Sequence, residues 1–491
     1  MNYKELLIGI DIGTSSVKVA LFDKTGKTLS SFTEDYPVYY PKKGYAEHSP
    51  DEWYDAVCKC TKKLSEQFDL SKVAGVGIDG QGWSCIPVSK DGTVLSNTPI
   101  WFDTRATKEI ETIKATVAEE KLFELCGNPL SPSYVTPKIL WFKNNKPDVY
   151  EQADAFLSSN GFVVYRLTGK YSCDYSQAYG QFFYDIANCV YDEAIAEKLG
   201  IDMAKIPPLC SSKEIIGYIT KKASKETGLK EGTPIAAGGL DAACGTLGAG
   251  VIKDGQTQEQ GGQAGGMSIC ISKPLKDPAL ILGNHVVDGK WLLQGGTAAG
   301  GGSLKWFASL FGKSYAEKDV FKAIDMEAAK SPAGANNVIF HPYLNGERSP
   351  IWDPDAKGLF WGMSLATTRG DMARAVMEGV AYSLKDNLET AEKAGANVGT
   401  LYSVGGSASS KVWMQIKSDV TGKKMKSASP ESASALGAAI LAGIGTGVYS
   451  DFEEAARITA IDGNEYSPDK NNEKIYRNGF KKYKDLYRRL K

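Results

Sequence analysis

The strongest chemical signal near the amino terminus is an aspartate followed by a turn rich in hydroxyl side chains. Asp11 ends an apolar segment. The turn after it supplies three hydroxyl groups and an ammonium group, those of Thr14, Ser15, Ser16 and Lys18. Backbone N–H groups of such a turn can form an anion-binding nest, and the lysine adds positive charge. The turn could hold Mg²⁺ and phosphate together, or it could be an ordinary hairpin with a polar turn.

A second carboxylate, Asp241, stands alone among glycine, alanine and leucine in residues 238–243. If a helix starts here, its dipole and its exposed N–H groups would favour a carboxylate, so a helix cap is one interpretation. The other interpretation is a general base beside closely approaching backbone. The residues alone leave both interpretations open.

Three further glycine clusters could bring backbone close to a nucleotide. They lie at residues 261–266, 300–302 and 405–406. Glycine has no Cβ, so its backbone can approach phosphate or ribose closely. Each cluster could instead reflect tight packing or a turn. With the glycines before Asp241 they make four such segments, and together with Asp11 they favour nucleotide binding.

The composition excludes several classes of protein. The 491 residues suffice for two or three domains, and 57 basic against 58 acidic residues give a net charge of −1. Because the chain has no excess of positive charge, we do not expect nucleic acid as a partner. The long uncharged stretch 432–450 is too weakly apolar to span a bilayer, so no membrane partner is expected. Three histidines and nine scattered cysteines indicate neither a His-built metal site nor a disulfide framework, and we expect a cytoplasmic protein.

Alternating strands and helices in both halves of the chain must position these residues. Residues 6–23 form two apolar runs around the polar turn, which predicts a β-hairpin. Further strands are predicted at 73–79, 85–88, 267–272 and 401–406, and helices from residue 51 and at 303–310, 369–394 and 474–491. We interpret the last, basic helix as docked on its domain rather than as a membrane or RNA contact. The pattern predicts an α/β protein with two domains, 1–249 and 250–491, packed around a cleft.

Seven motifs follow one another along nearly the whole chain. They are GIDIGTSSVK (9–18), GYAEHSPDEWY (44–54), PKILWFKNN (137–145), GGLDAACG (238–245), HPYLNGERSPIWDPDAKGLFWGMS (341–364), ARAVMEGVAYSL (373–384) and VGGSASSKVWMQIKSD (404–419). In these motifs and their order the chain resembles FGGY carbohydrate kinases of the actin-like ATPase superfamily, nearest to the xylulokinase branch. The resemblance implies two ribonuclease-H-like domains, with ATP and sugar meeting in the central cleft.

The resemblance also implies roles for the candidate residues. Asp241 would be the catalytic base, and Asp11 would organise Mg²⁺. Contacts to phosphate and nucleotide would come from Thr14, Ser15, Ser16 and Lys18 in the first domain, and from Gly262, Gln263, Ala264, Gly301, Lys305, Gly406 and Ser410 in the second. Many relatives have Gly-Thr where this chain has Gln263-Ala264, so the nucleotide contact there stays open. Glu347, Arg348 and Asp353 lie in a signature that we interpret as mainly architectural.

The resemblance places the sugar near a third set of residues: Gln81, Gly82, Trp83, Asp103, Arg105 and Asp241. Glycerol kinases carry an Arg-Glu pair at Gly82-Trp83, and the loss of both charged groups makes glycerol a poor candidate. Well-known xylulokinases carry Met-His there, so this chain departs from them as well. Ala242 stands where several xylulokinases have Asn. Trp83 could stack on a sugar face or belong to the core, and the sugar stays undecided.

We therefore predict an ATP- and Mg²⁺-dependent kinase that transfers the γ-phosphate to a hydroxyl of a ketopentose, with D-xylulose as first choice and D-xylulose 5-phosphate as product. The alternatives within the class are ribulose, L-xylulose, erythritol and glycerol. The contrasting class is a non-catalytic, ATP-binding actin-like scaffold or sugar sensor. The presence of both Asp11 and Asp241 argues against it, because a pure binder needs no base. The sequence leaves the oligomeric state open, with a homodimer as one option.

Overall fold

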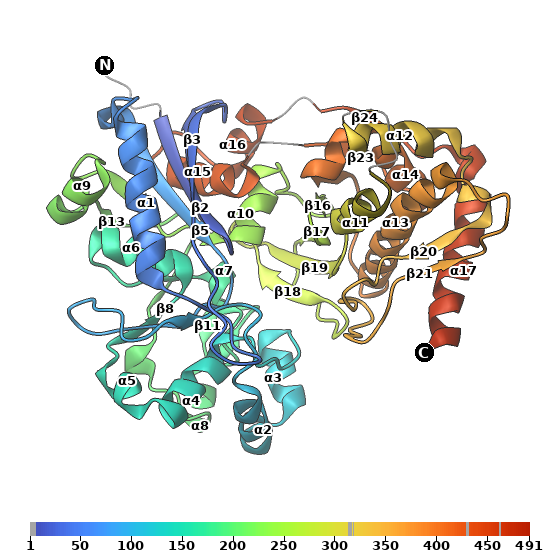
Figure 1. Cartoon of the computed structure of the whole chain (residues 1–491). Coiled ribbons are helices and arrows are strands. Elements are labelled where there is room, and N and C mark those ends of the chain that lie inside the picture. Colours follow the sequence, from blue (N-terminus) through green and yellow to red (C-terminus); the bar gives the residue numbers. More distant parts are fainter. Residues whose placement is uncertain (1–5, 313–316, 318, 429–431, 461–462) are drawn as a thin grey trace.

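The computed structural model describes residues 6–312, 317, 319–428, 432–460 and 463–491. The chain forms two α/β bodies, each built on a seven-stranded sheet, with a cavity between them (Figure 1). This architecture confirms the predicted fold class.

The first sheet has the strand order β13–β14–β5–β1–β2–β3, and β15 pairs beside β5. Its strands are β1 (Leu6–Ile12), β2 (Ser16–Asp23), β3 (Thr28–Asp35), β5 (Val73–Gly80), β13 (Ile215–Tyr218), β14 (Pro234–Ala236) and β15 (Gly239–Leu240). β1 and β2 form the predicted hairpin, and β1 pairs in parallel with β5. Helices cover both faces of this sheet, which explains the nearly continuous apolar sequences of β1 and β5.

The second sheet has the order β18–β19–β17–β16–β22–β23–β24. Its strands are β16 (Thr257–Gly261), β17 (Gly265–Ile271), β18 (Ile281–Asn284), β19 (Trp291–Thr297), β22 (Leu401–Val404), β23 (Met425–Ser427) and β24 (Glu465–Tyr466). The remaining strands form two-stranded sheets: β4 (Glu47–His48) with β7 (Thr98–Pro99), β6 (Ile86–Val88) with β8 (Ala155–Leu157), β9 (Cys173–Asp174) with β12 (Leu209–Cys210), β10 (Tyr184–Asp185) with β11 (Val190–Tyr191), and β20 (Ile339–His341) with β21 (Leu359–Trp361).

Helices pack against both sheets and their flanks. In the first half they are α1 (Pro50–Ser65), α2 (Thr107–Thr116), α3 (Glu119–Cys126), α4 (Val135–Asn145), α5 (Pro147–Gln152), α6 (Ser159–Thr168), α7 (Tyr175–Ala178), α8 (Glu193–Lys198), α9 (Lys221–Thr227) and α10 (Asp241–Gly248). In the second half they are α11 (Gly301–Phe311), α12 (Val320–Lys330), α13 (Arg369–Lys393), α14 (Lys411–Thr421), α15 (Ala433–Gly445), α16 (Phe452–Ile458) and α17 (Glu473–Leu490). The helices predicted from residue 51, at 303–310 and at 369–394 are confirmed, and a Thr368–Asp371 capping box starts the last of these.

The two faces of β1 and β5 differ in what they contact. The isoleucines of β1 pack with α1 on one face. Because side chains alternate along a strand, Gly9 and Asp11 lie on the opposite face, where Gly9 meets α15. Gly77 of β5 also meets α15, so Asp79, two residues further on, shares that face. Two aspartates therefore lie side by side at the ends of neighbouring strands.

Helix α15 lies between β23 and β24 of the second sheet in sequence but packs on β1, β5 and α10 of the first half. Its backbone touches theirs directly. A Cβ added to Gly9 or Gly77 would lie 1.8 Å from the carbonyl oxygen of Ala435 or Ala438, respectively. The boundary predicted between residues 249 and 250 stays a proposal, and any such division must assign α15 to the first body.

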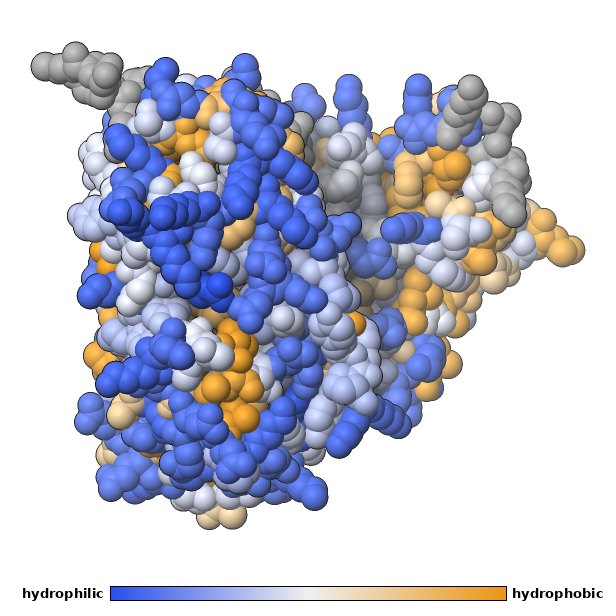
Figure 2. Space-filling model, turned by 60° about the vertical axis from the view of Figure 1, so that its left-hand side comes forward, coloured by the Kyte–Doolittle hydropathy of each residue, from blue (hydrophilic) through white to orange (hydrophobic). Residues whose placement is uncertain are grey.

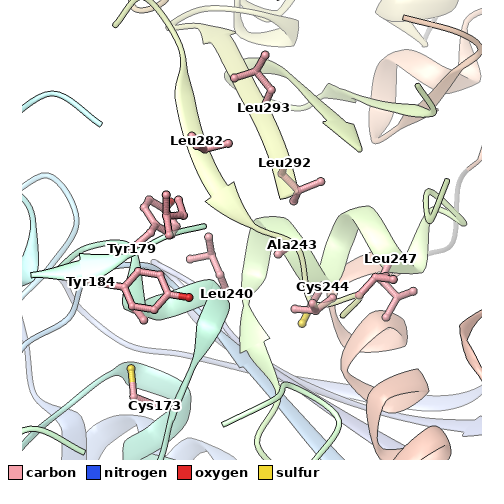
Figure 3. Packing of buried hydrophobic residues seen from close by; sticks show 14 of the residues in the cluster. Cys173, Tyr179, Tyr184, Leu240, Ala243, Cys244, Leu247, Leu282, Leu292 and Leu293 are labelled. Carbon is pink, nitrogen blue, oxygen red and sulfur yellow. The ribbon is translucent and has the colours of Figure 1, made fainter. Parts of the chain in front are cut away.

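One hydrophobic cluster, which borders the cavity, contains residues of both halves (Figure 3). Tyr184 and Leu240 of the first half face Leu282 and Leu292 of β18 and β19 across this cluster (Figure 3). Hydrogen bonds reinforce it, because the Asn128 side chain donates to the Leu282 carbonyl at 2.7 Å and accepts from the Leu282 N–H at 3.0 Å. The two halves of the chain are thus packed directly against each other at this cluster.

The surface seen in Figure 2 is mostly hydrophilic over the first half and is hollowed between the two bodies. Among the described residues, no helix has the length and apolarity needed to cross a bilayer. The basic helix α17 buries Tyr476, Phe480 and Tyr483 in the core of the second half, which confirms that it is docked.

We expect Gly77→Ala to destabilise the protein by about 3 kcal/mol, because its methyl group would overlap the carbonyl of Ala438 and force the helix off the sheet. Gly75→Ala is the matched control on the same strand. Its methyl group would meet the Thr446 methyl at 3.0 Å, and a side chain can shift at a cost of about 1 kcal/mol or less. Urea denaturation of both variants tests this ranking, and equal losses would contradict it.

Candidate active site

A cavity of about 470 Å³ opens between the two halves, where β1, β5 and β15 end. Its lining includes Asp11, Thr14, Gly82, Trp83, Trp101, Tyr179 and Asp241 from the first half, and Gln260, Ala264, Gly265, Gly266, Gln294, Arg348 and Ser434 from the second. The structure thus brings the two aspartates singled out in the sequence into one cavity. Both halves of the chain contribute polar groups to it.

Asp241 is the first residue of α10, and its position follows from the pairing of β15 with β5. Its carboxylate accepts the N–H of Ala242 at 2.6 Å. Burial, together with the negative charge of Asp11, raises the pKa of Asp241 to about 7. Leu240 occupies the cap position, and Asp241 follows it as the first helical residue, where its carboxylate accepts an N–H of the helix start while also lining the cavity. A carboxyl group with a pKa near neutrality can accept a proton at physiological pH.

Asp79 is a third carboxylate that the sequence analysis missed. It is fully buried, it is the register partner of Asp11 on β5, and neither of its carboxyl oxygens has a hydrogen-bond partner among the described residues. Burial, more than the neighbouring charges of Asp11 and Asp241, holds the pKa of Asp79 well above its usual range. The sequence did contain a signal for this carboxylate, because each strand has an Ile-Asp pair near its end, Ile10-Asp11 in β1 and Ile78-Asp79 in β5. Only their parallel register makes the two carboxyl groups neighbours.

The residues around Asp11 fit a magnesium ion held mainly by substrate. Burial raises the pKa of Asp11, and the charge of Lys18 acts in the opposite direction. Within the described ranges, no group of three or more His, Cys, Asp or Glu side chains is arranged as a metal cage. Mg²⁺ commonly binds one or two carboxylates and completes its shell with phosphate oxygens and water. Asp11, which lines the cavity, suits that mode.

The turn between β1 and β2 faces the cavity in a fixed conformation. The Gly13 N–H donates to the Ser16 carbonyl at 3.0 Å, and the Tyr36 hydroxyl donates to the Gly13 carbonyl. The Thr14 hydroxyl lies at the cavity and accepts the indole N–H of Trp101 at 3.0 Å. Asp11 and Lys18 are register partners across the hairpin. Of this turn, Gly13 and Thr14 line the cavity with Asp11, whereas Ser15, Ser16 and Lys18 are not among its lining residues, so their phosphate contacts stay a prediction.

The structure brings the three glycine clusters of the second half together. The N–H groups of Gly301 and Gly302 donate to the carbonyls of Gly262 and Gln263 at 2.8 and 2.9 Å. A Cβ added to Gly405 would lie 3.2 Å from the Gly261 backbone. The sequence shows the three turns but not their contact, because they are separated by about 40 and 100 residues.

The individual nucleotide candidates differ in their surroundings. Gly406 borders open space, since a Cβ added there would have no atom within 4 Å. Ala264 lines the cavity, and the Gln263 carbonyl is bonded to α11. Lys305 is exposed on α11, and the Ser410 hydroxyl caps α14 by accepting the Trp413 N–H at 3.0 Å. Their contacts to nucleotide stay a prediction.

A buried ion pair, which the sequence analysis missed, lies beneath these turns. Lys417 donates to Glu259 at 2.6 Å and to the Ser407 hydroxyl at 2.7 Å, and the Ser403 hydroxyl donates to the other oxygen of Glu259. The pair ties the short helix η5 (Gly406–Ser409) to β16. Through its bond to Ser407, the ion pair therefore helps to fix the conformation of the neighbouring Gly405–Gly406 turn.

The predicted sugar contacts divide into two groups. Gly82 and Trp83 line the cavity. Gln81, Asp103 and Arg105 do not, and their side chains are almost fully buried. Arg105 donates to Asp103 at 2.7 and 2.9 Å and forms an ion pair with Glu47 at 2.8 Å. Each charge is paired internally, so Asp103 and Arg105 shape the loop behind the cavity in this conformation instead of reaching a sugar.

Trp83 packs against other aromatic side chains and also borders the cavity, so it fits both a core residue and a residue that could stack on a sugar. Its ring packs edge-on against Tyr134 and Tyr179, with centroids 4.5 and 5.7 Å away, and it also lines the cavity. Its φ of 59° is unusual for a bulky residue. The buried ammonium of Lys138 donates to the carbonyls of Trp83 and Ile100 at 2.7 and 2.8 Å. Lys138 thereby holds two segments that border the cavity, and burial lowers its pKa to about 7.

We expect Lys138→Met to destabilise the protein by about 2 kcal/mol or more, because it leaves two buried carbonyls without a donor. Lys143→Met is the matched control on α4. Lys143 also donates to a backbone carbonyl, that of Gly200, but it is exposed, so its loss should cost about 0.5 kcal/mol or less. Urea denaturation compares the two variants. A Lys138 variant no less stable than the control would refute this role.

Comparisons with known proteins agree with one another. Residues 6–248 match the N-terminal domain of the FGGY family of carbohydrate kinases, and residues 269–446 match its C-terminal domain. A xylulose kinase of Staphylococcus epidermidis is 32% identical over 99% of this chain and 97% of its own length. A xylulose kinase of Bacillus subtilis is 31% identical over the same shares. The crystal structure of xylulose kinase from Rhodospirillum rubrum superimposes with a TM-score of 0.91 at 28% identity, over 99% of both chains.

Proposed function

The chain belongs to the FGGY family of carbohydrate kinases and is an ATP-dependent sugar kinase, and from this premise we propose that it phosphorylates D-xylulose to D-xylulose 5-phosphate in the cavity between its halves. One observation carries the proposal: a half-buried carboxylate with a pKa of about 7, Asp241, shares this cavity with Asp11 and the Thr14 turn. Full-length similarity to xylulose kinases supports the choice of sugar.

In the proposed reaction, the Asp241 carboxylate accepts the proton of a sugar hydroxyl. The hydroxyl oxygen forms a bond to the γ-phosphorus, the bond between the γ-phosphorus and the bridging oxygen breaks, and ADP leaves with that electron pair. The Asp11 carboxylate would hold Mg²⁺, and the ion would supply positive charge to the phosphates. The N–H groups and hydroxyls of the first turn, with Lys18, orient the phosphates from the first half.

The second half supplies the other contacts in this mechanism. The glycine turns at 261–266 and 405–406 receive the nucleotide, and Trp83 provides an apolar wall for the sugar. Closure of the halves excludes water, which would otherwise accept the phosphoryl group. Three further parts belong to the proposal: Mg²⁺ as the ion, from the resemblance and the setting of Asp11, the cytoplasm as the compartment, from the composition, and a homodimer as one option for the assembly.

The substrate is tested by measuring ADP release with MgATP and D-xylulose, L-xylulose, D- and L-ribulose, erythritol, glycerol or gluconate. We expect turnover with one pentulose, D-xylulose, and a loss of about 10²-fold or more in Asp241→Asn because the base is removed. Turnover confined to glycerol or gluconate would contradict the sugar assignment. ATP binding without turnover on any sugar would favour a scaffold or sensor, and an active Asp241→Asn would refute the mechanism.

The pH profile gives a separate test of the base. Asp241 must be ionised to accept a proton, and its raised pKa means that it is protonated below about pH 7. We expect kcat/KM to fall about tenfold per pH unit below that value and to level off above it. Any residual activity of Asp241→Asn should lack this dependence. A midpoint near pH 4 in the wild type would show an ordinary carboxylate and contradict the proposed environment.

A further inference from the structure

Arg348 reaches the cavity from the second half on a firmly held backbone. It lies between β20 and β21 and lines the cavity. Its N–H donates to the Glu347 carboxylate at 2.6 Å, and its carbonyl accepts the N–H of Trp352 at 2.7 Å. The position of this side chain is therefore fixed at its base.

The rest of the signature is architectural, as the sequence analysis expected. Glu347 accepts the Thr297 hydroxyl at 2.6 Å and the Ala298 N–H at 3.0 Å, which fixes the end of β19. Asp353 accepts the Tyr487 hydroxyl at 2.6 Å and so fastens α17. Both carboxylates are satisfied by the fold itself.

The Arg348 guanidinium differs from these neighbours. Within the described part of the chain, it forms no hydrogen bond and no ion pair through its side chain. Its charge acts on Tyr134 and Tyr179 of the first half, where it opposes the rise that burial causes in the pKa of both phenols. A guanidinium offers five N–H donors and no acceptor, so in a cavity it calls for oxygen atoms of a ligand.

The aromatic wall relates Arg348 to the base. Tyr179, Asp241 and Arg348 line the same cavity, and the charges of Asp241 and Arg348 act in opposite directions on the pKa of Tyr179. Trp83 packs against Tyr134 and Tyr179 and completes this wall. A sugar that lies along the wall with one hydroxyl at Asp241 would bring its other oxygens toward Arg348.

We propose that Arg348 binds the carbonyl and neighbouring hydroxyl at the non-reacting end of the sugar and thereby sets the preference for a ketose. This rests on the proposed function. Because Arg348 belongs to the second half and Trp83 to the first, the same contact links sugar binding to closure of the cavity.

The test compares Arg348→Met and Arg348→Lys with the control Arg477→Met, whose arginine is 68% exposed on α17. Sugar binding without nucleotide is followed by the fluorescence of the cavity tryptophans, Trp83 and Trp101, and the KM values for sugar and ATP are measured separately. We expect Arg348→Met to weaken D-xylulose binding by about 10- to 100-fold, since a charged hydrogen-bond donor is lost. The KM for ATP should stay within about twofold of the wild-type value. Arg348→Lys should bind D-xylulose with an affinity between those of the wild type and Arg348→Met, because lysine keeps the positive charge but lacks the planar array of N–H donors.

A xylitol arm tests recognition of the carbonyl, since xylitol carries a hydroxyl in its place. The wild type should bind D-xylulose more tightly than xylitol, and Arg348→Met should lose that difference. Unchanged D-xylulose binding in a folded Arg348→Met, or a xylitol preference unaffected by the substitution, would overturn the inference while the kinase assignment stands. If Arg348→Met does not fold, Arg348→Lys decides by the same readouts.

A wild type that binds D-xylulose through Arg348 but does not phosphorylate it would refute the proposed function and leave the inference standing. A wild type that binds neither ligand would overturn both.

Discussion

Backbone-to-backbone packing of α15 on β1 and β5 creates the environment of the reactive carboxylates. Glycine at Gly9 and Gly77 lets the helix come within contact of the strands, so no side chains and little solvent separate them. Asp11 and Asp79 lie at the ends of these strands, in a medium that disfavours their charges. Asp241, at the start of the neighbouring helix α10, shares this environment. With looser packing, water would enter and Asp241 would titrate as an ordinary carboxylate.

The two halves treat buried charge differently. In the second half, Glu259 is paired with Lys417 and bonded by Ser403, so the fold satisfies it. In the first half, Asp11, Asp79 and Asp241 act on one another with like charge, and among the described residues the positive charge of Lys18 offsets that of Asp11 alone. Proteins keep such unfavourable groupings mainly at functional sites. A cation arriving with phosphate would satisfy the first-half cluster, which is what a kinase supplies in each turnover.

The sequence predicted the local features of this site and missed those that depend on long-range register. The hairpin, the long helix α13 and the pair Asp11 and Asp241 follow from short patterns and motifs. Asp79 becomes a neighbour of Asp11 only through parallel pairing of strands about 60 residues apart. Asp103 and Arg105 looked suited to sugar hydroxyls, but two residues of opposite charge can equally satisfy each other, and here they do. Similarly, the small residues of α15 gave no indication of which sheet the helix would cover.

The proposed mechanism requires contributions from both halves at once. The proposed base and the first phosphate turn belong to the first half, whereas the glycine turns and Arg348 belong to the second half. The apolar cluster beside the cavity keeps the halves attached. A ligand that touches both sides favours the closed arrangement, because only there are all its contacts made. If the sugar bridges Trp83 and Arg348 while ATP bridges the two sets of phosphate turns, each substrate assists the closure that the other needs, and ATP alone meets an incompletely assembled site.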